Sequence, residues 1–451
     1  MKNICFSFVC ILCACLLLCP AVAYATEDER RSIPVESNAI EDWPQGPVTG
    51  ARAAIVLEVE TGVILYAKDI HARLYPASTT KLMTCLVALE NARLNDIVNF
   101  SYTAVDAVPA DGSRIGIEAG EALTMEQALY GIMVGSGNEV ANAVAEHVAG
   151  SMDAFVDLMN QRAQSLGLQD THFTNANGLH DPDHYTSAYD LAVIASAFFD
   201  SVALSRIGGT PSYHFTPTAT QPDDFWLRNK HRLITGEVFV EGVIGGKTGF
   251  TDEAGECLVT CAQREGMKLV SVVLFEDSPS QFIDSQSLLE YGFHNFSKIT
   301  LAGKEETVFP SMPAFFLPER NLFERPVTTL SFAQGDALIL PAGAAVADLT
   351  LSVAPPAEDA GEALAVFSYD WNGIEVGDAH VFRDVSEPFF TGRALHTRYI
   401  DLRIGVLVLL FGALIASTAV TAAHRTVIYF FGKESRRRRR NIRRRKRNSR
   451  M

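Results

Sequence analysis

The sequence predicts an α/β (α+β) protein whose antiparallel sheet carries a block of helices, followed by a small all-β domain and a C-terminal transmembrane helix. Alternating apolar patterns typical of strands occur over residues 53–69 and return over residues 239–275. The stretch between them has the apolar spacing of helices, and residues 404–423 contain no charged side chain. Strands at both ends of one region, with helices between them, predict a single sheet built from both ends of that region.

The first 25 residues have the pattern of a secretory signal peptide. A single lysine precedes an apolar run, and the small-x-small sequence Ala23–Ala25 predicts cleavage after Ala25. A lipoprotein signal is less favoured, because Leu18 precedes Cys19 where a small residue would be expected. Residues 26–48 are polar, contain prolines and lack periodicity, so we expect a linker.

Three cysteines remain after the signal peptide, namely Cys85, Cys257 and Cys261. The last two fall on one face of a predicted strand, too far apart along it to form a disulfide easily. We therefore expect buried free thiols rather than a disulfide framework.

The elements of the main region follow in order. A hairpin is predicted with its turn at Glu60–Gly62, and a first helix from Ser78 to about Asn91. Helical patterning continues at residues 125–134, 138–150, 152–167 and 187–199. Strands are predicted at residues 239–249, 256–263 and 268–275, and a last helix at residues 280–293.

The pattern of apolar residues changes after about residue 297. Short alternating runs, separated by turns such as Asn372-Gly373, predict a smaller all-β domain there. The uncharged segment after it would span about 30 Å as a helix, the thickness of a hydrocarbon core. The arginine-rich sequence that follows predicts a cytoplasmic tail, with the body outside the membrane. The predicted parts are a signal peptide (1–25), a linker (26–48), a main domain (49–296), a β-rich domain (297–395), a transmembrane helix (404–423) and a basic tail (432–451).

Charge is distributed unevenly along the 451 residues. Residues 433–451 hold twelve Lys/Arg and one Glu, a charge of +11, which leaves −26 on residues 1–432 for a total of −15. An acidic body argues against nucleic acid as a partner. The basic tail is expected to contact anionic lipid head groups.

The first candidate motif is LYPASTTKLMT at residues 74–84, which places Ser78 and Lys81 three residues apart at a helix start. Positions i and i+3 share a helix face, so the Lys81 amine can reach the Ser78 hydroxyl. A serine needs a base to become a nucleophile, and a lysine can be that base when burial and a nearby cation lower its pKa. Alone, the motif fits a capped helix with an exposed lysine at least as well.

The second motif contains Ser136 and Asn138, between two predicted helices. A hydroxyl there can relay a proton and an amide can hold a substrate carbonyl, although Asn138 also suits an ordinary helix N-cap. By itself this motif does not distinguish a site from a cap.

The third motif is the Lys-Thr-Gly sequence that begins at Lys247. A lysine midway along an apolar strand pattern is unusual, and Gly245, Gly246 and Gly249 remove side chains where another backbone can approach. An edge strand of this kind can pair with an extended peptide. We expect Lys247 to lower the pKa of Lys81 and to attract a carboxylate; the alternative is a glycine-rich hairpin with a solvated lysine.

The order of the three motifs is more specific than any one of them. Ser-x-x-Lys on a helix, Ser-x-Asn in a loop and Lys-Thr-Gly on a strand form the motif set of penicillin-binding proteins and β-lactamases. With the flanking sequences MVGSGNEVANAVAEHVAG and GGKTGFTDEAGECLVTCAQ, residues 50–296 resemble the D-alanyl-D-alanine carboxypeptidases of the low-molecular-mass penicillin-binding proteins. The resemblance implies a β-lactamase/transpeptidase-like catalytic domain that releases D-alanine from peptidoglycan stem peptides ending in D-Ala-D-Ala and is acylated by β-lactams.

Carried over position by position, the resemblance implies roles for individual residues. It makes Ser78 the acylated nucleophile and Lys81 its base, and it adds Ser136 to the catalytic residues. It implies substrate binding by Asn138, Lys247, Thr248, Gly249 and Phe250. Lys247 and Thr248 would bind the terminal carboxylate, and the N–H groups of Ser78 and Phe250 would form the oxyanion hole. No metal or other cofactor is implied.

Two features separate the chain from the family pattern. Some members carry an arginine just after the strand at residues 268–275 that helps to hold the terminal carboxylate, whereas this chain has Glu276 and Asp277. The difference leaves D,D-endopeptidase action on cross-links as an alternative. Tyr189-Asp190 stands where many members have Arg-Asp, and we interpret this pair as structural.

Three further functions were weighed against the serine carboxypeptidase. The stretch His180–His184 contains metal-ligand residue types, but its Asp-Pro step is typical of a turn. A β-lactamase would need a further carboxylate to activate the deacylating water, and the sequence identifies none. A non-catalytic, membrane-anchored protein that binds wall peptides is disfavoured by the three intact motifs.

Overall fold

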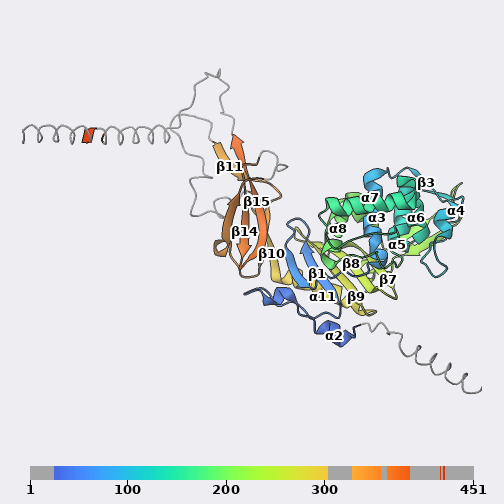
Figure 1. Ribbon diagram of the computed structural model, residues 1–451, viewed down its shortest axis with the longest axis horizontal. Helices are drawn as coiled ribbons and strands as arrows, with labels where there is room; N and C mark the ends of the chain where they lie inside the picture. The colour runs from blue at the N-terminus through green and yellow to red at the C-terminus, as the bar shows by residue number, and fades with distance from the viewer. Residues whose placement is uncertain (1–24, 303–327, 357–362, 386–416, 418–419, 422–451) are drawn as a thin grey trace, which may run out of the picture. The chain divides into compact units, whose positions relative to one another are not determined.

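The computed structural model describes residues 25–302, 328–356 and 363–385, together with Ser417, Val420 and Thr421. Contacts divide the chain into two units, Met1–Ser386 and Glu387–Met451. Three isolated residues represent the second unit, so the architecture in Figure 1 is that of the first unit.

Five antiparallel strands form the main sheet: β1 (Ala53–Glu58), β2 (Ile64–Lys68), β7 (Val243–Thr251), β8 (Gly255–Arg264) and β9 (Met267–Glu276). Their order across the sheet is β2-β1-β9-β8-β7. β1 pairs with β9 from Ala53↔Leu274 to Glu58↔Leu269, so strands from both ends of the main region meet at the centre. This confirms the predicted sheet and places β7 at one edge.

The two faces of the sheet belong to different cores. On β8, Cys257, Val259 and Cys261 are buried with the helical block, whereas Leu258 belongs to the core on the opposite face. Both of these cysteines and Cys85 are buried and free, as the sequence predicted.

A block of helices covers the first face (Figure 1). Its members are α3 (Lys81–Asn91), α4 (Tyr102–Asp106), α5 (Met125–Gly135), α6 (Asn138–Ala149), α7 (Met152–Ser165), α8 (Ala188–Asp200) and α9 (Val202–Gly208), with the strand pair β3 (Ile97–Asn99) and β4 (Ala122–Thr124). Side-chain caps fix several helix starts, because Thr124, Ser151 and Ser187 each accept a hydrogen bond from a backbone N–H of the first turn. The helices predicted from apolar spacing are therefore present.

The opposite face of the sheet is covered by α11 (Ser280–Asn295), which packs on β8 and β9. The short helix α10 (Arg232–Thr235) lies between β7 and α11. A hairpin of β5 (Ser212–Phe215) and β6 (Phe225–Arg228) precedes α10.

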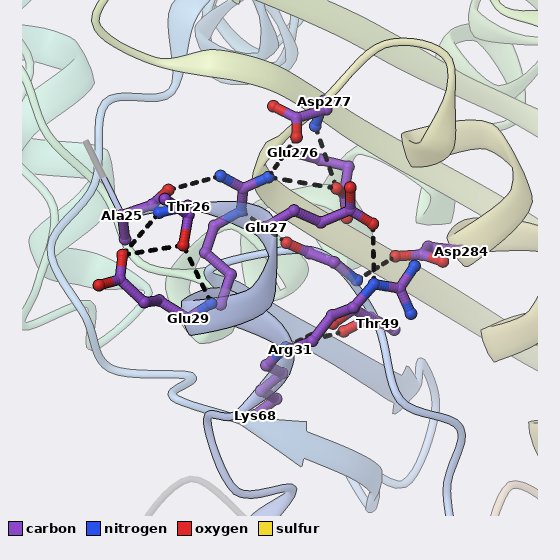
Figure 2. A network of polar contacts seen from close by, with 12 residues as sticks. Ala25, Thr26, Glu27, Glu29, Arg31, Thr49, Lys68, Glu276, Asp277 and Asp284 are labelled. Atoms are coloured by element: carbon purple, nitrogen blue, oxygen red, sulfur yellow. Dashed lines mark hydrogen bonds and ion pairs between the residues drawn. The ribbon is translucent and has the colours of Figure 1, made fainter. Parts of the chain in front are cut away.

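Residues 26–48, which the sequence predicted to be a linker, form α2 (Glu27–Arg31), the 3-10 turn η1 (Glu36–Ala39) and extended chain packed on the sheet. Trp43 is buried and donates its indole N–H to the Leu65 carbonyl at 3.0 Å. Figure 2 shows the polar network where this segment meets the end of β9. In that network the buried Arg30 donates to Asp277 at 2.6 Å. The linker prediction was wrong because this polar sequence is held by residues that lie far along the chain.

The later strands form smaller sheets. β10 (Phe296–Thr300) pairs with β12 (Ala337–Pro341). A second sheet of order β11-β15-β14-β13 contains β11 (Thr328–Phe332), β13 (Thr350–Ala354), β14 (Ala365–Trp371) and β15 (Ile374–Val385), and the 3-10 turn η3 (Val346–Asp348) precedes β13. Asn372 and Gly373 have positive φ angles of 49° and 87° in the turn between β14 and β15, where a turn was predicted.

The predicted signal peptide, transmembrane segment and basic tail lie outside the described residues, apart from Ala25 and the three isolated positions in the second unit. Across the described part of the chain, no single helix is long and apolar enough to cross a membrane. Among the described residues, α8 and α9 together satisfy the length and composition criteria, and they meet at a bend of 110°.

Candidate active site

Ser78 lies in the 3-10 turn η2 (Ala77–Thr80), which runs directly into α3. Ala77 has a positive φ of 47°, a strained conformation for a residue with a Cβ atom, and such strain concentrates at functional sites. Gly178 packs so closely here that an added Cβ would lie 1.9 Å from the Ala77 carbonyl oxygen. The strained turn thus holds the half-buried Ser78 at the wall of a cleft.

Lys81, the first residue of α3, is completely buried. Its Nζ lies 2.9 Å from Ser78 Oγ and 2.7 Å from Asn138 Oδ1, and it also donates to the carbonyl oxygen of Asn177. Burial lowers the pKa of Lys81 well below its usual value, and the charge of Lys247 lowers it further. The sequence-based expectation that Lys81 reaches Ser78 and is influenced by Lys247 matches this geometry.

Lys247 comes from β7 and is 2% exposed. Its Nζ donates to Ser136 Oγ at 3.1 Å and to the Thr248 carbonyl oxygen at 2.9 Å. Burial lowers the pKa of Lys247 to about 7, and the charge of Lys230 adds to the effect. Removal from water therefore weakens the preference of this lysine for its charged form.

The second motif forms a sharp connection between two helices. Ser136 follows α5 in the left-handed conformation, with φ of 59°, and Asn138 begins α6 two residues later. This turn directs the Ser136 hydroxyl to Lys247 and the Asn138 amide to Lys81. The two motif side chains thus each contact one of the two buried lysines.

Strand β7 approaches the Ser78 turn most closely at Gly249. A Cβ atom on Gly249 would lie 3.0 Å from the backbone nitrogens of Ser78 and Thr79. The missing side chain therefore lets the strand backbone reach the Ser78 N–H group. The next residue, Phe250, is exposed and lines the cleft.

The cleft has a volume of about 680 Å³. Six of the predicted site residues line it: Ser78, Ser136, Asn138, Thr248, Gly249 and Phe250. Lys81 and Lys247 are buried and contact this lining from within the protein. The eight residues selected from the sequence therefore come together in space.

Sequence reasoning missed a layer of amides that supports Lys81. The Asn177 backbone carbonyl accepts from Lys81, and the Asn177 side chain donates to Asn142 Oδ1 at 2.9 Å. Asn142 lies four residues after Asn138 on α6, so helical spacing was a usable signal for it. A backbone carbonyl such as that of Asn177 leaves no signal in residue type.

Glu276, the last residue of β9, and Asp277, which follows it, lie where some family members have an arginine, and here they face the N-terminal segment. Glu276 is buried, and Asp277 accepts a hydrogen bond from Arg30. The exposed cations that line the cleft are Lys230, between β6 and α10, and Arg232, the first residue of α10. Positive charge for a terminal carboxylate is thus available from a part of the chain that sequence reasoning did not select.

The histidines considered as metal ligands have other surroundings. His184 is buried; its Nδ1 accepts from the Thr174 N–H at 3.1 Å, so its Nε2 donates to Thr80 Oγ1 at 2.8 Å. Burial lowers the pKa of His184 to about 4, and the neutral ring supports the Ser78 turn. His180 lines the cleft. Within the described ranges, no group of three or more His, Cys, Asp or Glu side chains is arranged to hold a metal ion.

A serine in contact with a buried lysine, with a second buried lysine on the sheet edge beside it, defines a serine enzyme of the penicillin-binding class. Residues 41–278 match the protein family described as D-alanyl-D-alanine carboxypeptidase. The chain therefore belongs to the D-alanyl-D-alanine carboxypeptidase family and is a low-molecular-mass penicillin-binding protein.

Individual relatives agree with this assignment. The chain is 35% identical over 264 residues to D-alanyl-D-alanine carboxypeptidase DacF of Bacillus subtilis, covering 57% of this chain and 66% of the relative, slightly less than two thirds of its length. It is 30% identical to DacC of Escherichia coli, covering 79% of this chain and 89% of the relative. Penicillin-binding protein 5 of Haemophilus influenzae has a similar structure, with a TM-score of 0.61 and 27% identity, covering 76% of this chain and all of that chain. A mutant of the Streptomyces K15 DD-transpeptidase matches 55% of this chain and 99% of its own, with a TM-score of 0.52 and 30% identity.

Proposed function

We propose that this chain is a serine-type D-alanyl-D-alanine carboxypeptidase that removes the terminal D-alanine from peptidoglycan stem peptides. The observation that carries the proposal is the 2.9 Å contact between Lys81 Nζ and Ser78 Oγ in a site where burial and Lys247 lower the pKa of Lys81. A lysine that is neutral at working pH can take the serine proton, which an ordinary surface lysine cannot.

The hydrogen bonds of Lys81 orient its lone pair. A neutral amine has two N–H groups and one lone pair. Here the two N–H groups donate hydrogen bonds to Asn138 Oδ1 and to the Asn177 carbonyl oxygen. The lone pair then faces Ser78, whose hydroxyl donates its proton to Nζ as Oγ attacks the carbonyl carbon of the penultimate D-alanine. The base and the nucleophile are therefore aligned before substrate binds.

Donors around Ser78 suit the remaining steps. The N–H groups of Ser78 and Phe250 would stabilise the tetrahedral oxyanion, and the close approach of Gly249 supports this pairing. Ser136 accepts from Lys247, so its own O–H proton is available to the leaving nitrogen as the C–N bond breaks. D-Alanine leaves, and the proton that Lys81 took from Ser78 restores the Ser136 hydroxyl. Neutral Lys81 then takes a proton from the attacking water and returns it to Ser78 Oγ as the ester bond breaks and the shortened peptide is released.

Substrate binding is assigned to the edge strand and the second motif. Lys247 and Thr248 would bind the terminal carboxylate, with Lys230 adding positive charge in the same cleft. The Asn138 side chain would donate its N–H to the acyl chain carbonyl, because its oxygen is already occupied by Lys81. β-Lactams would acylate Ser78 by the same path.

A comparison of the wild type with Ser78→Ala tests this function. A labelled penicillin and a pentapeptide ending in D-Ala-D-Ala are added to each protein, and the covalent adduct and free D-alanine are measured. We expect both signals to disappear in Ser78→Ala and to persist in Ser165→Ala, a matched change at an exposed position. Undiminished D-alanine release by Ser78→Ala would refute the assignment.

The position of the enzyme in the cell is also part of the proposal. We propose that residues 1–25 direct export, that residues 404–423 span the membrane once, and that the basic tail is cytoplasmic. The support is the sequence: an uncharged segment of membrane length followed by arginines. Removing residues 404–451 should move the protein from the membrane fraction to the soluble extracytoplasmic fraction, and unchanged membrane association would contradict the proposal.

A further inference from the structure

Two cations at the start of α10 line the cleft beside the edge strand β7. Lys230 and Arg232 lie on either side of His231, whose side chain is completely buried. A Cβ atom on Gly246 of β7 would lie 2.5 Å from His231 Nε2, so the histidine packs directly against this strand. The two cations are therefore anchored next to the residue that precedes Lys247.

Arg232 lies on the same face of the sheet as the side chain of Thr248. Thr248 of β7 is directly opposite Leu258 of β8, and opposed residues of an antiparallel pair point to one face. Leu258 belongs to the buried cluster that also contains Phe282 of α11. The Arg232 guanidinium lies over the Phe282 ring, 5.2 Å from its centroid. Thr248, Phe282 and Arg232 thus line the cleft from one side of β7.

The guanidinium of Arg232 keeps its hydrogen-bond donors available to a ligand. The Arg232 side chain is 45% exposed and makes no hydrogen bond within the described residues. Its ion pair with Glu237 is 3.9 Å long, because Glu237 accepts a hydrogen bond from Arg228 at 2.7 Å. Glu256 is in the same lining, where burial raises its pKa while hydrogen bonds and Arg232 act in the opposite direction. A substrate carboxylate therefore meets little competition for this arginine.

The charge of Arg232 is permanent, unlike that of Lys247. Burial lowers the pKa of Lys247 to about 7, whereas an arginine stays charged throughout the working pH range. The planar guanidinium can also donate two parallel hydrogen bonds to the two oxygens of a carboxylate. A terminal amide offers one oxygen and no charge, so it cannot make this contact. Arg232 is therefore suited to distinguish a free terminal carboxylate from a blocked one.

We propose that Arg232, oriented by Phe282, binds the terminal carboxylate of the leaving residue together with Thr248, and that this contact makes the enzyme prefer peptides with a free carboxyl end over those closed as an amide. This inference rests on the proposed carboxypeptidase function. It assigns the enzyme to uncross-linked stem peptides, because an amide in place of the carboxylate loses the contact with Arg232.

Two peptides test the inference: diacetyl-L-Lys-D-Ala-D-Ala and the same peptide with a C-terminal amide. We expect the wild-type kcat/KM for the acid to exceed that for the amide by about tenfold or more, because hydrogen bonds between charged partners are the stronger ones. In Arg232→Gln the value for the acid should fall about tenfold, mainly through KM, while the value for the amide stays within about twofold.

Two further variants separate charge from structure. Arg232→Lys keeps the charge but lacks the planar fork, so its acid-to-amide ratio should lie between those of the wild type and Arg232→Gln. Arg206→Gln removes an arginine of α9 that is 58% exposed and lies outside the cleft lining, and it should keep the wild-type ratio. Equal losses with both peptides in Arg232→Gln would overturn the inference, because they would show that Arg232 only supports α10.

Binding is measured separately as protection of Ser78 from a labelled penicillin. Stronger protection by the acid than by the amide, lost in Arg232→Gln, supports the inference even in a protein that releases no D-alanine. That absence of release would overturn the proposed function and not this inference. A wild-type ratio and wild-type protection in Arg232→Gln would overturn the inference and leave the carboxypeptidase intact.

Discussion

Lys81 and Lys247 are both removed from water, and each is surrounded by oxygen atoms rather than by carboxylates close enough to form ion pairs in the described structure. Burial without a counter-ion favours the neutral form of a lysine. The charge of Lys247 also lowers the pKa of Lys81 through repulsion, so the Lys81 base depends on Lys247. The pair therefore supplies both the base and the cation of the site from the same residue type.

Replacing Lys247 should slow the acylation of Ser78 as well as weaken substrate binding. Without the charge of Lys247, the pKa of Lys81 rises, and each pKa unit it regains reduces the neutral fraction about tenfold when pH lies below that pKa. We expect the rate constant for acylation of bound penicillin to fall by at least tenfold in Lys247→Ala, with the acidic limb of its pH profile moved to higher pH. Lys268→Ala, on β9, is the control. A change in binding alone, with the acylation rate intact, would contradict this account of Lys81.

Burial of Lys247 also lowers the free energy of unfolding of the protein. Its pKa is about 7 in the folded protein and near 10.5 when unfolded, so between these pH values the unfolded chain binds more protons. Stability should therefore rise with pH across that window, and the full cost should be present below about pH 7. We expect Lys247→Met to raise the Tm at pH 6 by about 5 °C or more, and to raise it less at pH 10. Thermal unfolding at the two pH values checks this, and an equal or negative change at pH 6 would be inconsistent with a buried, destabilising lysine.

At the scale of elements, the N-terminal segment and the end of β9 are held together by Arg30. Its side chain is 4% exposed and donates to Asp277, to the Gly50 carbonyl and to the Ala25 carbonyl (Figure 2). The loop that begins at Asp277 continues to Ser278, which lines the cleft. The helix α2 therefore fixes one end of a loop that lines the cleft.

Arg30→Met should destabilise the protein markedly. The Arg30 side chain is 4% exposed, and its removal leaves the Gly50 and Ala25 carbonyl oxygens without this donor; an unsatisfied buried acceptor typically costs about 1 to 3 kcal/mol. Arg31→Met is the matched control, because the Arg31 side chain is 42% exposed and pairs with Glu27 on the same helix. Denaturant unfolding should give a change near zero for Arg31→Met. Equal stabilities of the two variants would show that α2 is only loosely attached.

The sequence was sufficient to predict an element or a site residue where the residue pattern follows directly from local backbone geometry. Alternation predicted β1, β8 and β9, apolar spacing predicted α3 and α5 to α8, and the three motifs selected residues that meet at one cleft. It was insufficient for contacts made by aperiodic polar residues, as in the bond from Arg30 to Asp277 across 247 positions. It also missed Lys230, whose place in the cleft depends on how β6 leads into α10.

At the scale of the whole molecule, the core on the α11 face of the sheet continues into the later strands. Trp43 and Phe296 lie with ring centroids 5.0 Å apart, and they share one buried cluster with Leu338 and Leu340 of β12. β12 also supplies the backbone partner of β10. The described β strands after residue 302 therefore complete a core that begins near residue 43.

A chain shortened to residues 26–302 tests this dependence. It lacks β12, so the pairing of β10 and the cover over Phe296 and Leu301 are lost. We expect the Tm to fall by several degrees, because exposing buried apolar surface costs about 25 cal/mol per Å². Acylation by penicillin per folded molecule should be unchanged, since the cleft residues precede residue 283. An unaltered Tm would mean that the two regions are energetically independent.

The strand order β2-β1-β9-β8-β7 also determines when the enzyme becomes active during its own synthesis. Ser78 and Lys81 leave the ribosome long before β7, and the centre of the sheet stays open until β9 arrives to pair with β1. Until then we expect Lys81 to be solvated and protonated, and so unable to take a proton from Ser78. We therefore expect a chain that lacks β9 to be unreactive toward acylating agents, and its reactivity to begin only once β9 has paired with β1.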